Sequence, residues 1–260
     1  MAAASREAVE KAKKGATVKD TFYVMTRWTA IALMLHYGMS FGLEIGLNAW
    51  LPGYFRMAFE DQLHQLGYSS LKALTVAAGT LASVQSFNAS LFRPFSGFIS
   101  DLFLRYRLMP WPFLTKEDPN APRIHWVFTS MVCITFMMVM FTLAGLSGNL
   151  VLTVAVLAIL GVTISFGTGS NFGLTPILFH KNPGIATGFI GGMCTIGGIV
   201  YPLIFGFMPN IHTGYAVVGI TIFIPIMLFF AVVFRRGKPV NVDAGLGSWR
   251  AFGLKEPLTT

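Results

Sequence analysis

One arginine lies in a stretch that is otherwise almost uncharged. Arg93 precedes Asp101 by eight residues, so it sits about 12 Å inside a helix that ends near Asp101, at 1.5 Å per residue. Ser86, Arg93 and Ser100 are spaced by seven and share nearly one helix face. A guanidinium donates two parallel hydrogen bonds to a planar oxyanion, so Arg93 is a candidate anion-binding residue. The alternatives are a structural ion pair with Glu44 or Asp101 and a side chain that extends to the membrane interface.

Glu44 is a second ionisable residue in an apolar stretch. At membrane depth its carboxyl group is a candidate proton carrier or a fixed counter-charge, and the alternative is a hydrated carboxylate near the outer surface. His36 and Tyr37 fit packing or hydrogen bonding better than metal ligation, because no second His or Cys lies at metal-ligand spacing. Cys133 and Cys194 both lie in apolar stretches and form no disulfide framework. We expect no metal and no other cofactor.

Glycines recur at helical spacing in two further stretches, 167–173 and 184–198. Small residues four apart let membrane helices approach closely, which predicts a packing role for most of them. No strand precedes the first run, so it is a poor dinucleotide-binding motif. Polar and aromatic residues in these stretches are candidates for the edge of a cavity: Ser170, Asn171, Phe172, Thr175 and Thr195.

The composition indicates which elements position these residues. Of the 260 residues, 54% are hydrophobic and 12% are charged, whereas soluble domains carry about 25% charged residues. The charge-free gaps 124–180 and 182–234 hold 57 and 53 residues, enough for two helices of about 20 residues each and a turn. We therefore predict an all-α polytopic membrane protein with six transmembrane helices, at 28–51, 71–99, 124–146, 150–179, 184–208 and 213–234.

The positions of Lys and Arg predict the orientation, because loops that contain them tend to stay in the cytoplasm. Two of the 19, Arg56 and Lys72, fall in the loops expected outside, Arg93 lies in a span, and the other 16 occupy the opposite segments. The net charge of +8 is thus interpreted as a topology signal rather than as a nucleic-acid footprint. Both termini are expected in the cytoplasm, at the cell (plasma or inner) membrane.

Three segments follow from this division. Residues 1–26 are expected to be a basic cytoplasmic linker without the apolar core of a signal peptide, 27–235 a six-helix transmembrane domain, and 236–260 a cytoplasmic tail. The loop 105–123 contains four prolines, which makes a regular element there improbable.

Four stretches resemble the nitrate/nitrite porter family of the major facilitator superfamily. Residues 35–55 (LHYGMSFGLEIGLNAWLPGYF) resemble its seventh helix, and 88–101 (NASLFRPFSGFISD) are similar to its eighth helix and the loop motif that follows. Residues 167–179 (GTGSNFGLTPILF) and 186–198 (ATGFIGGMCTIGG) look like its tenth and eleventh helices. The resemblance covers about residues 25–235, and its motifs are specific in combination.

The resemblance implies roles for particular residues. Arg93 matches the anion-binding arginine of the eighth helix, Phe172 lines the substrate cavity, and Glu44 is a candidate coupling group. Further candidate hydrogen-bond donors to the anion are Asn171, Thr195 and Tyr37. The cytoplasmic loop motif corresponds to Gly97, Asp101 and Arg105, and the glycine-rich nitrate signature to Gly188, Gly191, Gly192, Gly197 and Gly198. Two departures are Thr195, where many members have asparagine, and the lengthened loop after Arg107.

Family members have twelve helices, and the matching arginine of the second helix has no counterpart in this sequence. The resemblance therefore implies the C-terminal half of a nitrate/nitrite transporter working by proton symport or nitrate/nitrite exchange. The chain is then a fragment, a split half, or a half that assembles with a complementary half or with itself. Its expected partners are nitrate or nitrite, protons and the lipid bilayer, and no nucleic acid. The alternatives are a transporter of another small anion and a transport-inactive half that serves as a binding or regulatory subunit; an enzyme is not expected.

Overall fold

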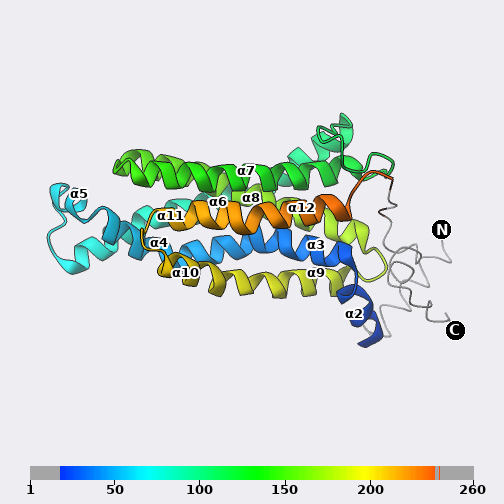
Figure 1. Cartoon of the computed structure of the whole chain (residues 1–260), viewed down its shortest axis with the longest axis horizontal. Coiled ribbons are helices and arrows are strands. Elements are labelled where there is room, and N and C mark those ends of the chain that lie inside the picture. The colour runs from blue at the N-terminus through cyan, green and yellow to red at the C-terminus, as the bar shows by residue number, and fades with distance from the viewer. Residues whose placement is uncertain (1–17, 238–239, 241–260) are drawn as a thin grey trace.

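A computed structural model of the chain describes residues 18–237 and residue 240. Within these residues the chain is helical apart from turns, loops and one isolated β-bridge between Leu114 and Arg235. The long helices run side by side in an elongated bundle (Figure 1). The predicted linker 1–26 and tail 236–260 lie mostly outside the described residues; the linker contributes one short helix, α2 (Val18–Met25), at one end of the bundle.

Five helices of the described part are long and apolar enough to cross a membrane. They explain the hydropathy of the chain and make it a multi-span integral membrane protein. The first is α3 (Trp28–Tyr37), which continues through a π turn (Gly38–Gly42) into α4 (Leu43–Ala58); the second and third are α7 (Ala121–Leu146) and α8 (Leu150–Leu178). The fourth is α9 (Pro183–Met193), which continues through a 3₁₀ turn (Cys194–Ile196) into α10 (Gly197–Phe207). The fifth is α11 (Thr213–Val217), which continues through a π turn (Val218–Phe223) into α12 (Ile224–Val233).

The remaining expected span, 71–99, is also a helix, α6 (Leu71–Arg105), but it is not among these five. At 35 residues it is the longest helix described, about 52 Å at 1.5 Å per residue. Polar residues in its middle, among them Gln85, Ser86, Asn88 and Arg93, keep it less apolar than the other five. The helix was predicted correctly, whereas its membrane span is not established by length and composition.

Two glycines bring α6 and α8 into close contact. A Cβ atom at Gly161 would lie 2.6 Å from the carbonyl oxygen of Gln85, and one at Gly169 would lie 2.6 Å from that of Arg93. Any side chain at these positions would push the two helices apart. The backbone of Arg93 is therefore held directly against α8.

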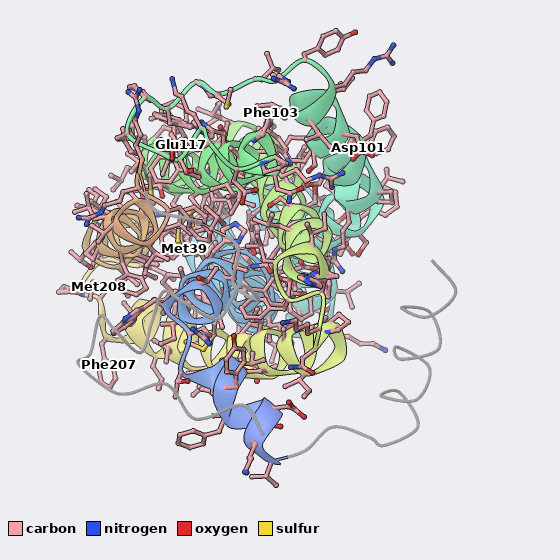
Figure 2. The ribbon with its side chains drawn as sticks, turned by 90° about the vertical axis from the view of Figure 1, so that its right-hand side faces the viewer. Met39, Asp101, Phe103, Glu117, Phe207 and Met208 are labelled. Carbon is pink, nitrogen blue, oxygen red and sulfur yellow. The ribbon has the colours of Figure 1, made fainter. Side chains whose placement is uncertain are left out.

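The two ends of the bundle differ. One carries the short helix α5 (Glu60–Gln65), and the other carries the loop between α6 and α7 (Figure 1). That loop is irregular, as its prolines predict, yet it is attached to the chain after α12: the amide of Thr115 donates to the carbonyl of Phe234 at 2.8 Å, and the amide of Arg236 to that of Phe113 at 3.0 Å. Figure 2 looks onto this end, with Asp101 on α6 and Glu117 in the loop.

Candidate anion site

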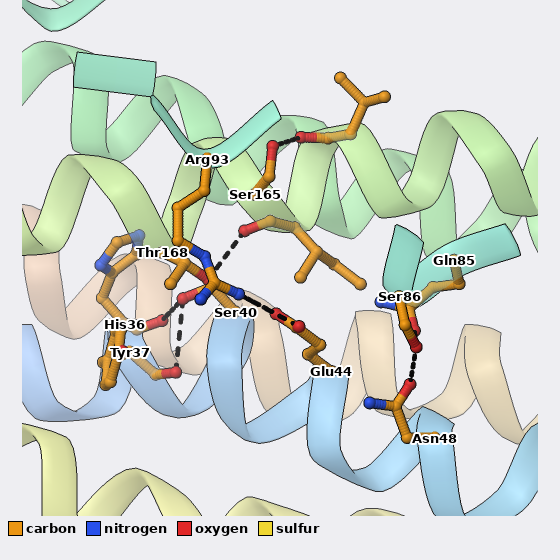
Figure 3. Close-up of polar contacts among 12 residues, drawn as sticks. His36, Tyr37, Ser40, Glu44, Asn48, Gln85, Ser86, Arg93, Ser165 and Thr168 are labelled. Carbon is orange, nitrogen blue, oxygen red and sulfur yellow. Dashed lines mark hydrogen bonds and ion pairs between the residues drawn. The ribbon is translucent and has the colours of Figure 1, made fainter. Parts of the chain in front are cut away.

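Arg93 forms an ion pair with Glu44. Its Nη2 donates to both carboxylate oxygens of Glu44, at 2.8 and 3.1 Å (Figure 3). Asp101, the other partner considered from the sequence, pairs instead with Arg123 of α7 at 2.7 Å. The Nε atom of Arg93 is buried and has no hydrogen-bond partner among the described residues. The edge of the guanidinium formed by Nε and Nη2 thus donates hydrogen bonds to Glu44 through Nη2 only.

Glu44 is more deeply buried than its partner. Its side chain is 7% exposed, against 32% for that of Arg93. This burial does not fit a hydrated carboxylate: Glu44 lies inside the helix bundle, on a helix, α4, that packs against both α6 and α10. A buried carboxylate of this kind depends on its cation, since an unpaired charge is costly in a poorly hydrated site.

The contacts of α6 with α4 follow the polar face predicted from the spacing of seven. Ser86 donates a hydrogen bond to the side-chain oxygen of Asn48, two turns along α6 from the Arg93 pair (Figure 3). Asn48 in turn lies one helical turn after Glu44. The polar face of α6 is therefore matched by a polar face of α4, with the ion pair as its charged position.

Three aromatic rings adjoin the ion pair. The Cζ atom of Arg93 lies 5.5 Å from the ring centroid of Phe41, within the range of a cation–π contact. Phe41 stacks on Tyr37 at 5.4 Å, and Tyr37 meets Phe172 edge-on at 5.2 Å. Tyr37 is buried, whereas Phe172 is 45% exposed. The predicted residues Tyr37 and Phe172 are thus brought together, and Phe41 connects them to Arg93.

Phe41 was missed in the sequence analysis although a signal for it exists. It lies four residues after Tyr37 and three before Glu44, the spacing that places side chains on one helix face. It also lies in the π turn Gly38–Gly42, a conformation that occurs often at functional sites. Within this turn, the Ser40 hydroxyl donates to the carbonyl of His36 at 3.3 Å, and Ser40 packs where Gly167 of α8 leaves room.

Asn171 lies elsewhere in the bundle interior. Its Nδ2 donates to the carbonyl of Leu33 at 2.7 Å and lies 3.0 Å from Nδ1 of His36, while its Oδ1 accepts from Thr175 at 2.7 Å. His36 Nε2 lies 3.3 Å from the hydroxyl of Ser130. No hydrogen bond joins Asn171 to the ion pair among the described residues. Its side chain instead links α8 to α3 and, through His36, to α7.

Thr195 is also placed apart from Arg93. Its hydroxyl donates to the carbonyl of Gly192 at 2.7 Å, and the residue is exposed on the 3₁₀ turn between α9 and α10. Ser170, the remaining polar candidate of α8, is buried and donates to the carbonyl of Gly167 at 2.9 Å. Neither hydroxyl takes part in the ion-pair cluster.

The glycine-rich stretch divides into two parts. Gly197 and Gly198 are packed: a Cβ atom there would lie 2.9 Å from Cα of Gly42 and 2.6 Å from Cγ2 of Ile45, respectively. A Cβ atom at any of Gly188, Gly191 and Gly192 would meet nothing within 4 Å. Close packing thus accounts for the glycines nearest α4 and not for those of α9.

The residues of the predicted cytoplasmic loop motif lie at the end of α6, separate from the ion pair. Asp101 is 67% exposed and bound to Arg123, and Arg105 lies beside Tyr106, its Cζ 5.8 Å from the ring centroid. A Cβ atom at Gly97 would meet no neighbour within 4 Å. No group of three or more His, Cys, Asp or Glu side chains within the described residues is arranged to hold a metal ion.

Comparison with known proteins adds to this geometry. No protein-family model matches the chain. The probable nitrate/nitrite antiporter NarK1 of Thermus thermophilus is 27% identical over 183 residues, covering 66% of this chain and 36% of that protein. High-affinity nitrate transporter 2.3 of Oryza sativa subsp. japonica is 26% identical over 84% of this chain and 39% of its own length. High affinity nitrate transporter 2.7 of Arabidopsis thaliana is 24% identical over 74% and 34%, respectively.

These relatives are transporters and not enzymes, and the chain spans a little over a third of their length. The match extends over most of the chain and agrees with the resemblance of its helices. Together with the five apolar helices, it shows that this chain is a distant homologue of the nitrate/nitrite transporters of the major facilitator superfamily.

Proposed function

We propose that the chain is the C-terminal six-helix half of a nitrate/nitrite porter, in which Arg93 binds the transported oxyanion. One observation carries this proposal: Arg93 lies in the interior of α6 with a buried, unpartnered Nε beside an Nη2 that is already a donor. A planar oxyanion accepts two parallel hydrogen bonds from such an edge. The distant similarity to nitrate transporters supports nitrate or nitrite as the anion.

The aromatic residues have a defined role in this proposal. Phe41 holds the guanidinium from one side, and Tyr37 and Phe172 extend the aromatic surface beyond it. The edges of these rings carry partial positive charge and can contact a weakly hydrated anion, and the Tyr37 hydroxyl offers it a hydrogen bond. Asn171 and Thr195 act indirectly, because their side chains are engaged in other contacts.

A complementary half is the proposed partner. Transporters of this superfamily rock two halves about a site near the middle of the membrane, and the greater part of each relative lies outside the matched segment. In the assembled protein, α6 also spans the membrane, with its polar face turned toward the anion path. Both termini lie on the cytoplasmic side of the plasma or inner membrane. A second copy of the chain is the alternative partner.

Nitrate uptake tests the proposal. The chain is expressed with and without a complementary six-helix half in a host that lacks nitrate uptake, and labelled nitrate is followed. Replacing Arg93 by Lys removes the two-donor edge but keeps the charge, so uptake should fall by about 10- to 100-fold. Arg56→Lys, at an exposed position at the end of α4, is the matched control and should retain uptake.

The results separate the candidate functions. Equal uptake by the wild type and by Arg93→Lys would disprove the role of Arg93. Uptake of another small anion in place of nitrate would support a transport function with a different substrate. Nitrate binding without uptake in either expression would identify a binding subunit rather than a transporter.

A further inference from the structure

Two pairs of consecutive residues meet between α3 and α8. His36 and Tyr37 lie on α3, and Asn171 and Phe172 lie on α8. The Nδ1 atom of His36 lies 3.0 Å from the amide nitrogen of Asn171, and the ring centroids of Tyr37 and Phe172 are 5.2 Å apart. Consecutive side chains leave a helix about 100° apart, as His36 and Tyr37 do in Figure 3. A buried polar contact thus lies directly beside the aromatic contact of the anion site.

The hydrogen bonds of Asn171 fix the direction of each bond in the polar pair. Its Nδ2 donates to the Leu33 carbonyl at 2.7 Å, and its Oδ1 accepts from the Thr175 hydroxyl at 2.7 Å. The second hydrogen of Nδ2 is therefore donated to His36 Nδ1, which must be the unprotonated ring nitrogen. The ring proton is then on Nε2, 3.3 Å from the hydroxyl of Ser130. His36 is thus a neutral imidazole in one tautomer, with both nitrogens engaged.

The aromatic pair lacks an anchor of this kind. Phe172 has no hydrogen-bonding group and is 45% exposed. Among the described residues, Tyr37 provides the only aromatic ring that it contacts. Tyr37 itself stacks on Phe41 at 5.4 Å, within the same helical segment. The distance between the two rings of the pair therefore depends on how α8 lies against α3.

The buried polar contact specifies that arrangement. If α8 moved along α3, the Asn171 amide and His36 Nδ1 would separate inside the bundle, where both residues are at most 2% exposed. Each group would then be buried without a partner, which costs free energy. Apolar side chains alone would specify the arrangement less strictly, because they can repack, whereas a fully satisfied polar network favours one arrangement.

We propose that His36 and Asn171 are positioning residues for the anion site: the buried hydrogen bond between them holds Tyr37 against Phe172 and so limits the size of the anion that is bound beside Arg93. With these rings held in place, a small planar oxyanion fits better than a larger tetrahedral one. This inference rests on the proposed function and adds to it two residues that act on anion selectivity without touching the anion.

The ratio of nitrate to perchlorate affinity tests this role. The full chain is purified in detergent micelles and titrated calorimetrically with sodium nitrate and with sodium perchlorate. His36→Leu removes the acceptor but leaves the Asn171 bond to Leu33. Its nitrate affinity should fall by about 3- to 30-fold, the range for residues that act through others. Perchlorate affinity should fall less, so that the ratio decreases. Asn171→Leu, which removes both bonds, should lower the ratio further.

Two matched variants separate positioning from general stability. In His36→Asn the amide oxygen takes the place of Nδ1 as an acceptor, so the nitrate-to-perchlorate ratio should stay close to that of the wild type. Ser130→Ala removes the other partner of His36, on α7. This change should lower the melting temperature and leave the ratio unchanged. Equal losses of selectivity in His36→Leu and Ser130→Ala would overturn the positioning role.

A double-mutant cycle tests whether His36 acts through the aromatic pair. In a Phe172→Leu background the ring that His36 is proposed to position is absent. His36→Leu should then have little further effect on the nitrate-to-perchlorate ratio, so that the two changes are strongly non-additive. Additive effects of the two changes would show that His36 affects the ion by another route and would overturn the proposal.

A measurement on the wild type covers the case in which His36→Leu does not fold. The chain has five histidines, and ¹⁵N spectra of histidine-labelled protein identify the His36 signal as the one missing in His36→Asn. We expect an unprotonated Nδ1 and a protonated Nε2, with and without nitrate. Exchange between tautomers, as in a free imidazole, would overturn the positioning role. Absence of nitrate binding by the wild type, or equal binding by Arg93→Lys, would instead overturn the proposed function itself.

Discussion

Arg93 and Glu44 depend on each other for stability as well as for the proposed binding. Removing Arg93 leaves the carboxylate of Glu44 buried without its cation, which destabilises a protein by about 3–5 kcal/mol in a fully buried pair and by less here, where Arg93 is partly exposed. Arg93→Met should therefore melt at a lower temperature than the double variant Arg93→Met/Glu44→Gln in the same micelles. Strictly additive effects of the two changes would show that the ion pair is absent in solution.

A second residue-scale prediction concerns His212, which lies in the connection between α10 and α11. Its Nδ1 is 3.0 Å from the hydroxyl of Tyr54, and burial lowers the pKa of His212 below its usual 6.5. Because the unfolded chain then binds this proton more readily than the folded chain, stability is lost as the pH falls through about 6.5.

Melting temperatures measured at about pH 7.5 and about pH 5.5 check this dependence. The loss on acidification should be smaller in His212→Gln than in the wild type, because the variant lacks the titrating imidazole. His64→Gln, at an exposed position on α5, should keep the wild-type loss. An equal loss in the wild type and in His212→Gln would contradict the prediction.

Individual site residues could be predicted from the sequence where burying their charge costs free energy. Arg93 and Glu44 stood out because charges in apolar stretches need partners, although the sequence left the partner open between Glu44 and Asp101. Phe41 and the engaged amide of Asn171 were not predictable in the same way. An aromatic ring in an apolar helix is common, and the direction of an asparagine depends on neighbours more than a hundred residues away in sequence.

At the scale of the helices, glycines separate packed from open faces. Gly161 faces the backbone of α6, where a Cβ atom would lie 2.6 Å from the Gln85 carbonyl, while Gly188 has no neighbour within 4 Å. Gly161→Ala should therefore destabilise the chain by about 1–3 kcal/mol through overpacking. Gly188→Ala should be neutral or stabilising by about 0.5–1 kcal/mol, because alanine favours the helix.

Thermal unfolding of the purified chain in micelles measures both glycine variants side by side. The pair is matched in chemistry and differs only in what surrounds the added methyl group. If both variants lost the same stability, the close contact between α6 and α8 would not exist in solution. A strong loss in Gly188→Ala alone would show that α9 is packed against a partner.

The helices themselves were largely predictable. A long charge-free stretch in a membrane must satisfy its backbone hydrogen bonds within the protein, and a helix does this within the stretch itself. The boundaries at 124–146 and 150–179 differ from α7 and α8 by no more than three residues. The two π turns and the 3₁₀ turn were not predictable, since they arise from close contacts between helices, such as that of Gly42 with Cys194. The membrane span of α6 is the one that length and composition do not establish, because its polar face lowers the mean hydropathy of the helix.

At the scale of the whole molecule, the distribution of basic residues predicts which end faces the cytoplasm. Single cysteines at Glu60, on α5, and at Glu117, in the loop between α6 and α7, mark the two ends of the bundle. In right-side-out membranes, a maleimide that cannot cross the bilayer should label Glu60→Cys directly and Glu117→Cys only after permeabilisation. The wild type, whose Cys133 and Cys194 lie within helices, measures the background. Reversed labelling would invert the proposed orientation.

The π turn Gly38–Gly42 has a consequence for how related chains can differ in length. A π turn accommodates one residue more than an α-helical path would, and each residue rotates a helix by about 100°. Because the turn absorbs this extra residue, its loss would convert 28–58 into a regular α-helix and leave α3 and α4 in their present orientation. Tyr37 and Glu44, on either side of the turn, would keep their positions, whereas Phe41 lies within it. The contact of Phe41 with Arg93, and not the Arg93–Glu44 pair, is therefore the part of the site that depends on the bulge.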